Sequence, residues 1–499
     1  MSKFFRLCSC EFTKIIKKKS TKVMLIILII SLFASAGFAI LTKKMYSLSD
    51  EIYENIDYKS NLQSEIDSLK YEINENNDSL DESSKNSIQA KIDIYQFAID
   101  NQINIYTKYW KTDVITSDLL TSKEKIYNYK SLKDEESEKI EQENFNKISE
   151  LLIKDDFIGY INNKKEMLKK DFDKGQINQN EYDDELYVLN LEEKYEIGKV
   201  YNPDDKWKIN LINEIRLLQN NVRSGIDTTT QKALTEETLK KNKNNIKINE
   251  YRIEHNMAPY MTGVGDSIGS TRKSYDYMVS SFSMMIIAVM IIIMAGSSIS
   301  AEISKGTIKF WSFTPNKRWK ILLSKFIVIT FILIVTTVLM SLLSSLVGNI
   351  FFGSANAQDY IYVSNGQVHT INYIAFSIIY NLVCAIDVFV FLIFAMMLST
   401  VARNTAVAVG ISIAAYLGGS TIMQILNLLI KKDWMRFIPF NNLELSSRIF
   451  TNDMSYSATT LLSNITGNIS VSFSLGVLGV CAILMIITMF DSFRKRDIV

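Results

Sequence analysis

Six apolar stretches, each long enough to cross a membrane, constrain this chain more than any other feature of its sequence. The hydrocarbon core of a bilayer is about 30 Å thick, so a helix needs roughly 20 apolar residues to span it. Backbone groups in lipid find no water, and a helix satisfies their hydrogen bonds internally. We therefore predict an all-α membrane protein with six spanning helices, at residues 23–41, 278–300, 326–348, 373–398, 406–430 and 471–490.

Two of these stretches need comment. The first resembles a signal peptide, but its apolar region is too long, and Lys43 and Lys44 follow it where a small-residue cleavage site would stand. We interpret it as a retained anchor. The fifth is the least regular, because Gly418, Gly419 and Gln424 interrupt it.

Charge is divided unequally between the apolar half and the long segment 42–277. That segment holds 34 basic and 45 acidic residues, a net charge of −11, whereas the remainder holds 21 basic and 9 acidic residues and carries +12. With six spans both termini lie on one side, where 17 Lys and Arg face four acidic residues, mostly in 1–22, 301–325 and 491–499. The positive-inside rule predicts that this side is cytoplasmic. Residues 42–277 and 431–470 are then extracellular, in a multi-pass protein of the plasma membrane.

The segment 42–277 has the periodicity of helices rather than strands. Leu62, Ile66, Leu69 and Ile73 recur every three or four positions, as in amphipathic helices that pack like a coiled coil. A polar run at 74–79 predicts a turn that makes the first two helices a hairpin. We interpret the charged residues as the solvated faces of these helices; the alternative is a specific site for cations or peptides. The acidic excess, with no basic tract, argues against nucleic-acid binding.

Signatures of catalysis and of cofactor binding are missing from the sequence. His255 and His369 are the only histidines, and their separation offers no metal-binding pair, so we expect no metal site. The chain has no G-x-x-x-x-G-K-[ST] stretch and therefore no P-loop for ATP. Cys8 and Cys10 form a C-x-C pair without a neighbouring ligand, which favours two reduced thiols over a metal or lipidation site. We predict that the chain is not an enzyme.

The segment between the second and third spans, 301–325, is the most informative part of the sequence. It contains the pattern E-x-x-x-G-T…P-x-x-R…K, carried by Glu302, Gly306, Thr307, Pro315, Arg318 and Lys325. In this pattern the chain resembles the membrane subunits of ABC-2-type ABC transporters, whose second and third spans are joined by such a stretch. The six spans and the long insertion after the first also fit. The resemblance covers the membrane half alone, and many members of that family have short loops where this chain has 42–277.

The resemblance implies a six-helix ABC-2-type (type V exporter-like) bundle plus an extracellular helical, coiled-coil-like domain. It implies that 301–325 is a coupling helix that docks into a separate cytoplasmic P-loop ATPase. That ATPase would bind ATP and Mg²⁺, and this chain would bind no cofactor. A second permease subunit, identical or different, would complete the transporter.

The residue types in 301–325 favour such docking independently of the family resemblance. Phe310 and Trp311 are aromatic residues in an otherwise basic loop, and on a short interfacial helix they can fill a partner's groove. Pro315 breaks this helix before the third span. The alternative is an amphipathic helix that anchors the loop to lipid and contacts no partner.

Two weaker features lie elsewhere in the membrane half. Asp387 stands in the middle of the fourth span, where a bare carboxylate is costly. It faces a transport path or a subunit interface, or else it is protonated or paired within the bundle. Residues 434–440 resemble the re-entrant external region of ABC-2 folds; the alternative is an interfacial anchor that uses Trp434 and Arg436.

These observations predict a permease subunit that couples ATP hydrolysis on its partner to efflux of an amphipathic peptide, antibiotic or lipid, as in resistance to antimicrobial peptides. The alternative is a membrane scaffold or receptor similar to the YhgE/Pip group, which has an external helical region and needs no ATPase. An ion-driven carrier is disfavoured, because Asp387 is the only carboxylate within spans two to six.

Overall fold

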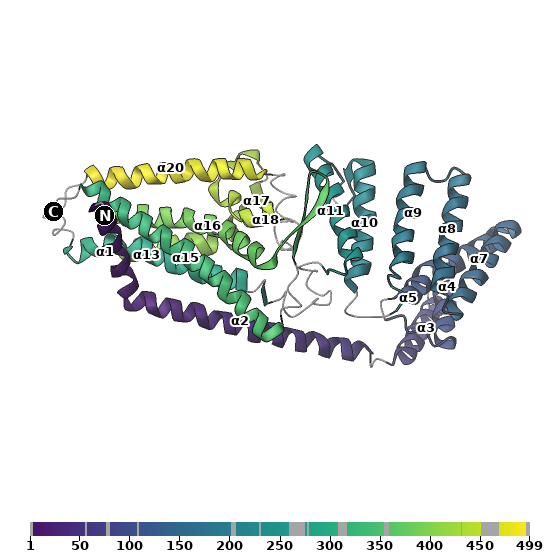
Figure 1. The fold of residues 1–499 in the computed structure, drawn as a ribbon. Coiled ribbons are helices and arrows are strands. Elements are labelled where there is room, and N and C mark those ends of the chain that lie inside the picture. Colours follow the sequence, from purple (N-terminus) through teal and green to yellow (C-terminus); the bar gives the residue numbers. More distant parts are fainter. Residues whose placement is uncertain are drawn as a thin grey trace.

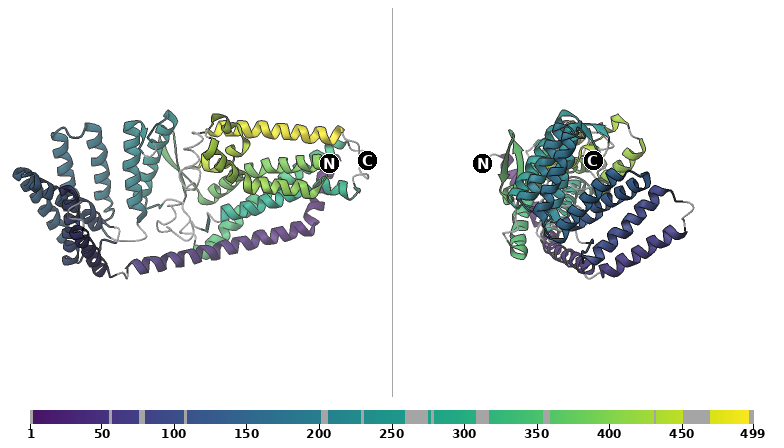
Figure 2. Two further views of the ribbon diagram at one scale, coloured as in Figure 1. Left: turned by 180° about the vertical axis from the view of Figure 1, so that it is seen from behind. Right: turned by 90° about the vertical axis from the view of Figure 1, so that its right-hand side faces the viewer.

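The computed structural model describes residues 3–54, 57–75, 80–106, 109–200, 206–228, 231–258, 275–276, 279–307, 317–353, 359–430, 432–450 and 469–495. These residues form two parts, a bundle of long apolar helices and a helical domain beyond one end of it (Figure 1). The long helix α2 (Lys19–Glu54) runs along the bundle and on towards the domain. Helix α1 (Lys3–Lys17) and the last residues of α20 (Val471–Lys495) lie at the opposite end of the bundle (Figure 2).

Six helical segments in the described part of the chain are long and apolar enough to cross a membrane. They are the first part of α2, η3 with α13 (Val279–Ser283 and Met284–Ser297), α15 (Arg318–Phe352), α16 (Tyr373–Ala402), α17 (Thr405–Ile430) and α20. Helix α13 lies at the centre, with Ile287, Ala288 and Ile291 fully buried. Side chains on the outer faces are equally apolar but exposed, as Ile26, Phe331 and Ile483 are. Apolar side chains outside as well as inside are what lipid requires.

The spans match the predicted ones closely, with one informative difference at the third. Helix α15 begins at Arg318 and not near Phe326, so the end of the predicted coupling loop is the first two turns of a helix. The reason is local: from Arg318 onward the sequence has no proline or glycine until Gly348, and Ile321 and Leu322 find buried positions in the bundle.

The helical domain consists mainly of helices that pack against their neighbours in the chain. They are α3 (Tyr58–Glu75), α4 (Glu82–Asp100), α5 (Trp110–Asp113), η1 (Val114–Leu119), α6 (Leu120–Leu132), α7 (Glu135–Ile153), α8 (Phe157–Asp173), α9 (Gln179–Lys194), α10 (Lys206–Ser224) and α11 (Glu236–Glu254). Helices α3 and α4 pack together, as the predicted hairpin requires; of its predicted turn, 74–75 belong to α3 and 76–79 lie outside the described residues. Side chains cap several N-termini, such as Asp81, Asp134 and Asp156, because their oxygens accept otherwise unpaired N–H groups.

The helical domain has two main cores. One lies among α3 to α8 and includes Leu62, Trp110 and Tyr160, and the other lies among α9 to α11 and includes Val188, Ile212 and Ile253. A two-residue strand pair, β1 (Ile226–Asp227) and β2 (Lys232–Ala233), joins α10 to α11.

A second β-hairpin connects the bundle to the helical domain. Strands β3 (Tyr360–Ser364) and β4 (Gln367–Ile371) pair antiparallel, with Tyr360 opposite Ile371, in the connection between α15 and α16. The hairpin packs on α11, where Lys247 Nζ donates to the Gly366 carbonyl at 2.8 Å. On its other side Tyr360 stacks on Phe376 of α16, with ring centroids 4.0 Å apart.

Candidate functional site

The segment after the second span is fixed by hydrogen bonds to the turn between α16 and α17. Helix α14 (Ser300–Ser304) begins where the backbone N–H of Ser300 donates to Ser399 Oγ at 2.9 Å. The hydroxyls of Ser300 and Thr405 lie 3.0 Å apart. Gly306 ends the helix with φ +69°, a left-handed conformation that glycine adopts without strain.

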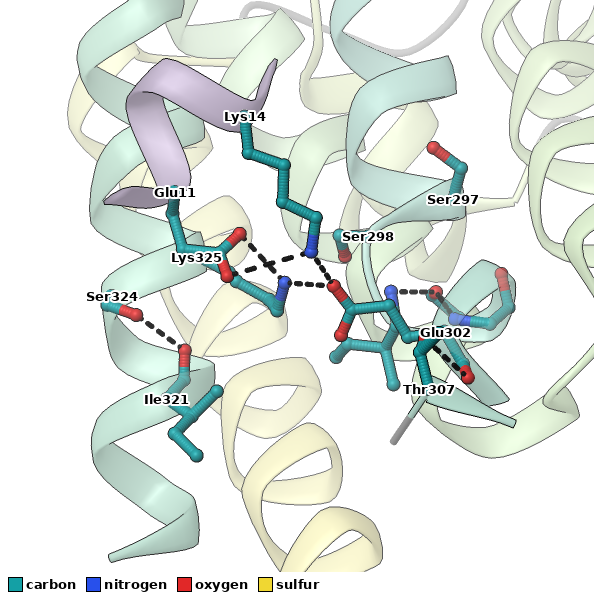
Figure 3. A network of polar contacts seen from close by, with 12 residues as sticks. Glu11, Lys14, Ser297, Ser298, Glu302, Thr307, Ile321, Ser324 and Lys325 are labelled. Atoms are coloured by element: carbon teal, nitrogen blue, oxygen red, sulfur yellow. Dashed lines mark hydrogen bonds and ion pairs between the residues drawn. The ribbon is translucent and has the colours of Figure 1, made fainter. Parts of the chain in front are cut away.

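Four charged side chains from three separate segments meet at this end of the bundle (Figure 3). Lys325 Nζ of α15 lies 2.9 Å from Glu302 Oε1 of α14 and 2.9 Å from Glu11 Oε2 of α1. Lys14 of α1 pairs with the same Glu302 oxygen and lies 3.9 Å from Glu11. We call these four residues the end cluster. Two lysines and two glutamates make it neutral overall.

The end cluster lies at the edge of the apolar core. Lys325 is 2% exposed and Glu302 8%, whereas the Lys14 side chain is about half exposed. Burial lowers the pKa of Lys14, but the hydrogen bond to Glu302 and the charge of Glu11 raise it more, so its net pKa is above the usual value. Oε2 of Glu302 is buried without a hydrogen-bond partner in the described part of the chain. The charged side chains of the end cluster can therefore stay buried only because they pair with one another.

Helix α1 brings its two charges to the cluster by packing along α15. Phe12 meets Phe331 edge to face at 6.0 Å, and Ile15 is buried. The chain bends at Lys18, between α1 and α2, and the Thr21 hydroxyl in the first turn of α2 donates to the Ile15 carbonyl at 2.8 Å. The sequence reasoning did not single out Glu11 or Lys14. The available signal was an isolated acid in a basic segment, spaced three residues from a lysine and so on the same helix face.

The predicted coupling residues fall into three groups. Glu302 and Lys325 meet in the end cluster, and Thr307 Oγ1 donates to the Glu302 carbonyl at 3.2 Å. Gly306 and Arg318 are exposed on either side of them. Three others lie outside the described residues, namely Phe310, Trp311 and Pro315.

Asp387 anchors a segment that returns into the bundle. Its Oδ2 accepts from the backbone N–H of Glu444 at 3.0 Å. Asp387 follows Tyr373 by fourteen residues, so this contact lies roughly 21 Å along α16. Glu444 stands between η7 (Pro439–Asn442) and α18 (Leu445–Ile449), and the buried Leu445 packs in one core with Val390 and Ile393.

Further contacts hold this returning segment against α17. Asn427 and Asn441 exchange two amide hydrogen bonds, of 2.9 and 3.2 Å. A Cβ on Gly419 would lie 2.3 Å from Phe440 Cε1, so only glycine allows this ring to approach. Of the two glycines that interrupt the fifth stretch, Gly419 therefore admits the returning segment. Trp434 lies in η6 (Asp433–Phe437), just before it, and is 56% exposed.

No group of three or more His, Cys, Asp or Glu side chains suited to a metal ion occurs in the ranges that the structure describes. The four cysteines are free, and Cys10 is exposed.

Six long helices with apolar outer faces define a multi-pass membrane protein whose spanning segments are helical. Residues 243–499 match the profile of the family described as "Protein of unknown function (DUF2705)", and the chain belongs to that family. The match includes Glu302, Lys325 and Asp387, while Glu11, Lys14 and most of the helical domain lie outside it.

Two similar proteins come from Bacillus subtilis (strain 168). "Uncharacterized protein YhcI" is 30% identical over 259 residues, which cover 51% of this chain and 76% of that protein. "Uncharacterized membrane protein YdbK" is 29% identical over 214 residues, 43% of this chain and 78% of that protein. No solved structure matches the chain.

Proposed function

We propose that this chain is the membrane subunit of an ATP-driven exporter of the ABC-2 type, powered by a separate cytoplasmic ATPase. The end cluster is the observation that carries the proposal. It joins the segment that resembles a coupling helix to α1 and α15 through buried ion pairs at Glu302 and Lys325. A force on this segment is thereby passed to two further helices.

Because the end cluster is buried, its ion pairs hold the three helices firmly together. Separating Lys325 from its two carboxylates would leave charges in an apolar setting, which costs several kcal/mol. Helices α1, α14 and α15 therefore move together when a partner displaces the loop. The hydrogen bonds of Ser300 to Ser399 and Thr405 extend this connection to α16 and α17.

In this proposal the rest of the bundle holds the path for an amphipathic cargo such as a peptide, antibiotic or lipid. Residues 439–449 return into the bundle beside Asp387, and they rest on α16, α17 and α20. A tilt of these helices changes the packing around the returning segment and opens or closes the bundle at that level. The termini and the end cluster are then cytoplasmic, the helical domain is extracellular, and two membrane subunits form one exporter.

Purification of the full chain from its own cells in mild detergent, followed by mass spectrometry, tests this proposal. We expect a stoichiometric P-loop ATPase with the unaltered chain and its loss with Gly306→Val or Arg318→Glu. Gly306→Asn is the matched control, because asparagine tolerates a positive φ whereas a β-branched residue does not. A chain that purifies without an ATPase would exclude the exporter.

One observation favours a second candidate, a scaffold or receptor similar to the YhgE/Pip group. Residues 57–242, which form most of the helical domain, lie outside the family match and contribute most of the residues of its two main cores. Such a domain suits recognition of a partner without any ATPase. The second candidate predicts that the chain purifies without an ATPase and keeps its activity in Gly306→Val.

A further inference from the structure

A cavity of about 320 Å³ lies within the helical domain, where its two main cores meet. We call it the Trp110 pocket. One wall comes from α5, η1 and α8, and the other comes from α9, α10 and the turn at Gly198. In Figure 1, α9 lies between α8 and α10, so these helices form consecutive walls. Its volume is in the range of small-molecule sites, which often occur where two packed units adjoin.

Aromatic and branched side chains line the floor of the Trp110 pocket. The Trp110 ring lies 5.8 Å from Phe157 and 5.4 Å from Tyr160. The Trp110 backbone N–H donates to the Gly198 carbonyl at 2.9 Å, which ties α5 to the far wall. Ile212 closes that wall and is buried. An aromatic or branched side chain has a preformed surface here.

The rim of the pocket carries charges of both signs. Its charged residues are two acids and two bases, namely Asp113, Glu192, Lys164 and Arg216. A ligand of one sign would meet like charge on the rim, whereas a ligand with both signs meets a partner for each. A molecule with an ammonium, a carboxylate and an apolar side chain fits the floor and the rim together.

The existing ion pairs indicate where each ligand charge would lie. Arg216 is held by Glu185 at 3.1 Å and donates to Glu192 Oε1 at 2.8 Å, so it positions the Glu192 carboxylate. Lys164 lies 3.9 Å from Asp118 Oδ2, beyond hydrogen-bond distance, and 4.9 Å from the Tyr160 ring. The Lys164 ammonium is therefore the group that can bind a ligand carboxylate. Asp113 and Glu192 supply the carboxylates for a ligand ammonium.

We propose that the Trp110 pocket binds a short peptide with free termini and an apolar or aromatic side chain. The side chain rests on Trp110 and Ile212, the peptide carboxylate binds Lys164, and its ammonium binds Glu192. This inference does not depend on the exporter proposal, because binding in the helical domain requires no ATPase.

Isothermal titration calorimetry of the full chain in detergent with leucyl-phenylalanine tests the pocket. We expect saturable binding that Lys164→Gln and Glu192→Gln each weaken by about tenfold, as for a lost charged hydrogen bond. The matched controls are Lys165→Gln and Glu193→Gln. That pair bridges the same two helices one residue further on and does not line the pocket, so its loss should leave affinity unchanged.

Dipeptides with one blocked terminus show which residue of the pocket binds which charge of the ligand. N-acetyl-leucyl-phenylalanine should bind weakly and lose its dependence on Glu192, whereas leucyl-phenylalanine amide should lose its dependence on Lys164. Ser117→Trp places a bulky ring in the cavity from an exposed wall position and should abolish binding. Circular dichroism melting establishes that each variant folds. No saturable binding by the unaltered chain, or equal loss in the control pair, would overturn the proposal.

Discussion

Lys325 occupies a position where a lysine would ordinarily be excluded, with 2% of its surface exposed beside an apolar core. Two carboxylates make this possible, because each lies 2.9 Å from its ammonium. A buried pair is weak evidence for added stability, since removal from water offsets much of the attraction. The pairing instead determines whether the charges can be buried, because each charge stays buried only while its partners remain.

Replacement of Lys325 by methionine therefore tests the cluster directly. We expect Lys325→Met to lower the free energy of unfolding by about 3 kcal/mol, the usual cost of leaving a buried charge without its partner. The double variant Glu302→Gln/Lys325→Met should recover part of this loss, because the cluster then keeps one acid, Glu11, for one base, Lys14. Denaturant unfolding in detergent measures both. Lys320→Met, on the same helix but stacked over Trp319, is the control, and equal losses for Lys320 and Lys325 would contradict the prediction.

Asp387 is either an anchor for the returning segment or a charge on a transport path. As an anchor, its Oδ2 holds the Glu444 N–H, so Asp387→Ala should cost about 1–3 kcal/mol of unfolding free energy. Asp387→Asn keeps an acceptor oxygen and should cost less. Unfolding measurements on both variants rank them. A transport role alone would instead show stable variants of both kinds with activity lost.

The charge pattern near these residues was only partly predictable from sequence. Glu302 and Lys325 belong to one recognisable pattern, and their side chains pair across a separation of 23 residues. Glu11 and Lys14 are almost 300 residues away in sequence, and no local periodicity connects them to Glu302. Their pairing depends on the path of α1 along α15, which is a tertiary property.

At the scale of elements, hydropathy located the spans because lipid imposes the same requirement along a whole helix. It placed the start of α15 late, because a helix can extend beyond the lipid and hydropathy marks only the apolar part. The hairpin β3–β4 was not predicted, although Asn365-Gly366 between alternating β-branched and aromatic residues is a strong hairpin signal. Both residues have positive φ, of 51° and 79°, as that turn requires.

The hairpin should determine how firmly the helical domain is held to the bundle. Tyr360 joins Phe376 and Phe450 in one aromatic cluster on the bundle side, while β3 packs on α11. Tyr360→Ala removes the shared ring, so we expect faster backbone hydrogen exchange in β3, β4 and α11, and unchanged exchange in α3 and α4. Mass spectrometry of peptic fragments measures this. Unchanged exchange in α11 would mean that the hairpin does not hold the domain.

At the scale of the molecule, both ends of the described chain lie at one end of the bundle and the helical domain at the other. The distribution of basic residues predicts which end is cytoplasmic. In a variant whose only cysteine is Cys10, which is exposed, we expect no labelling of intact cells by a membrane-impermeant maleimide. The same reagent should label Tyr71→Cys in the helical domain, where Tyr71 is 65% exposed. Labelling of Cys10 but not of Tyr71→Cys would show that the topology is the opposite of the predicted one.

Helix α2 can amplify a small movement at one end of the bundle into a larger movement at the end near the helical domain. It is one uninterrupted helix of 36 residues, with the bend at Lys18 at one end and the helical domain at the other. At 1.5 Å per residue it is a lever about 54 Å long, so a tilt of about 5° at Lys18 would sweep its far end through about 5 Å. A small displacement beside Lys14 would thus become a shift about as wide as a side chain at Glu54, the far end of α2.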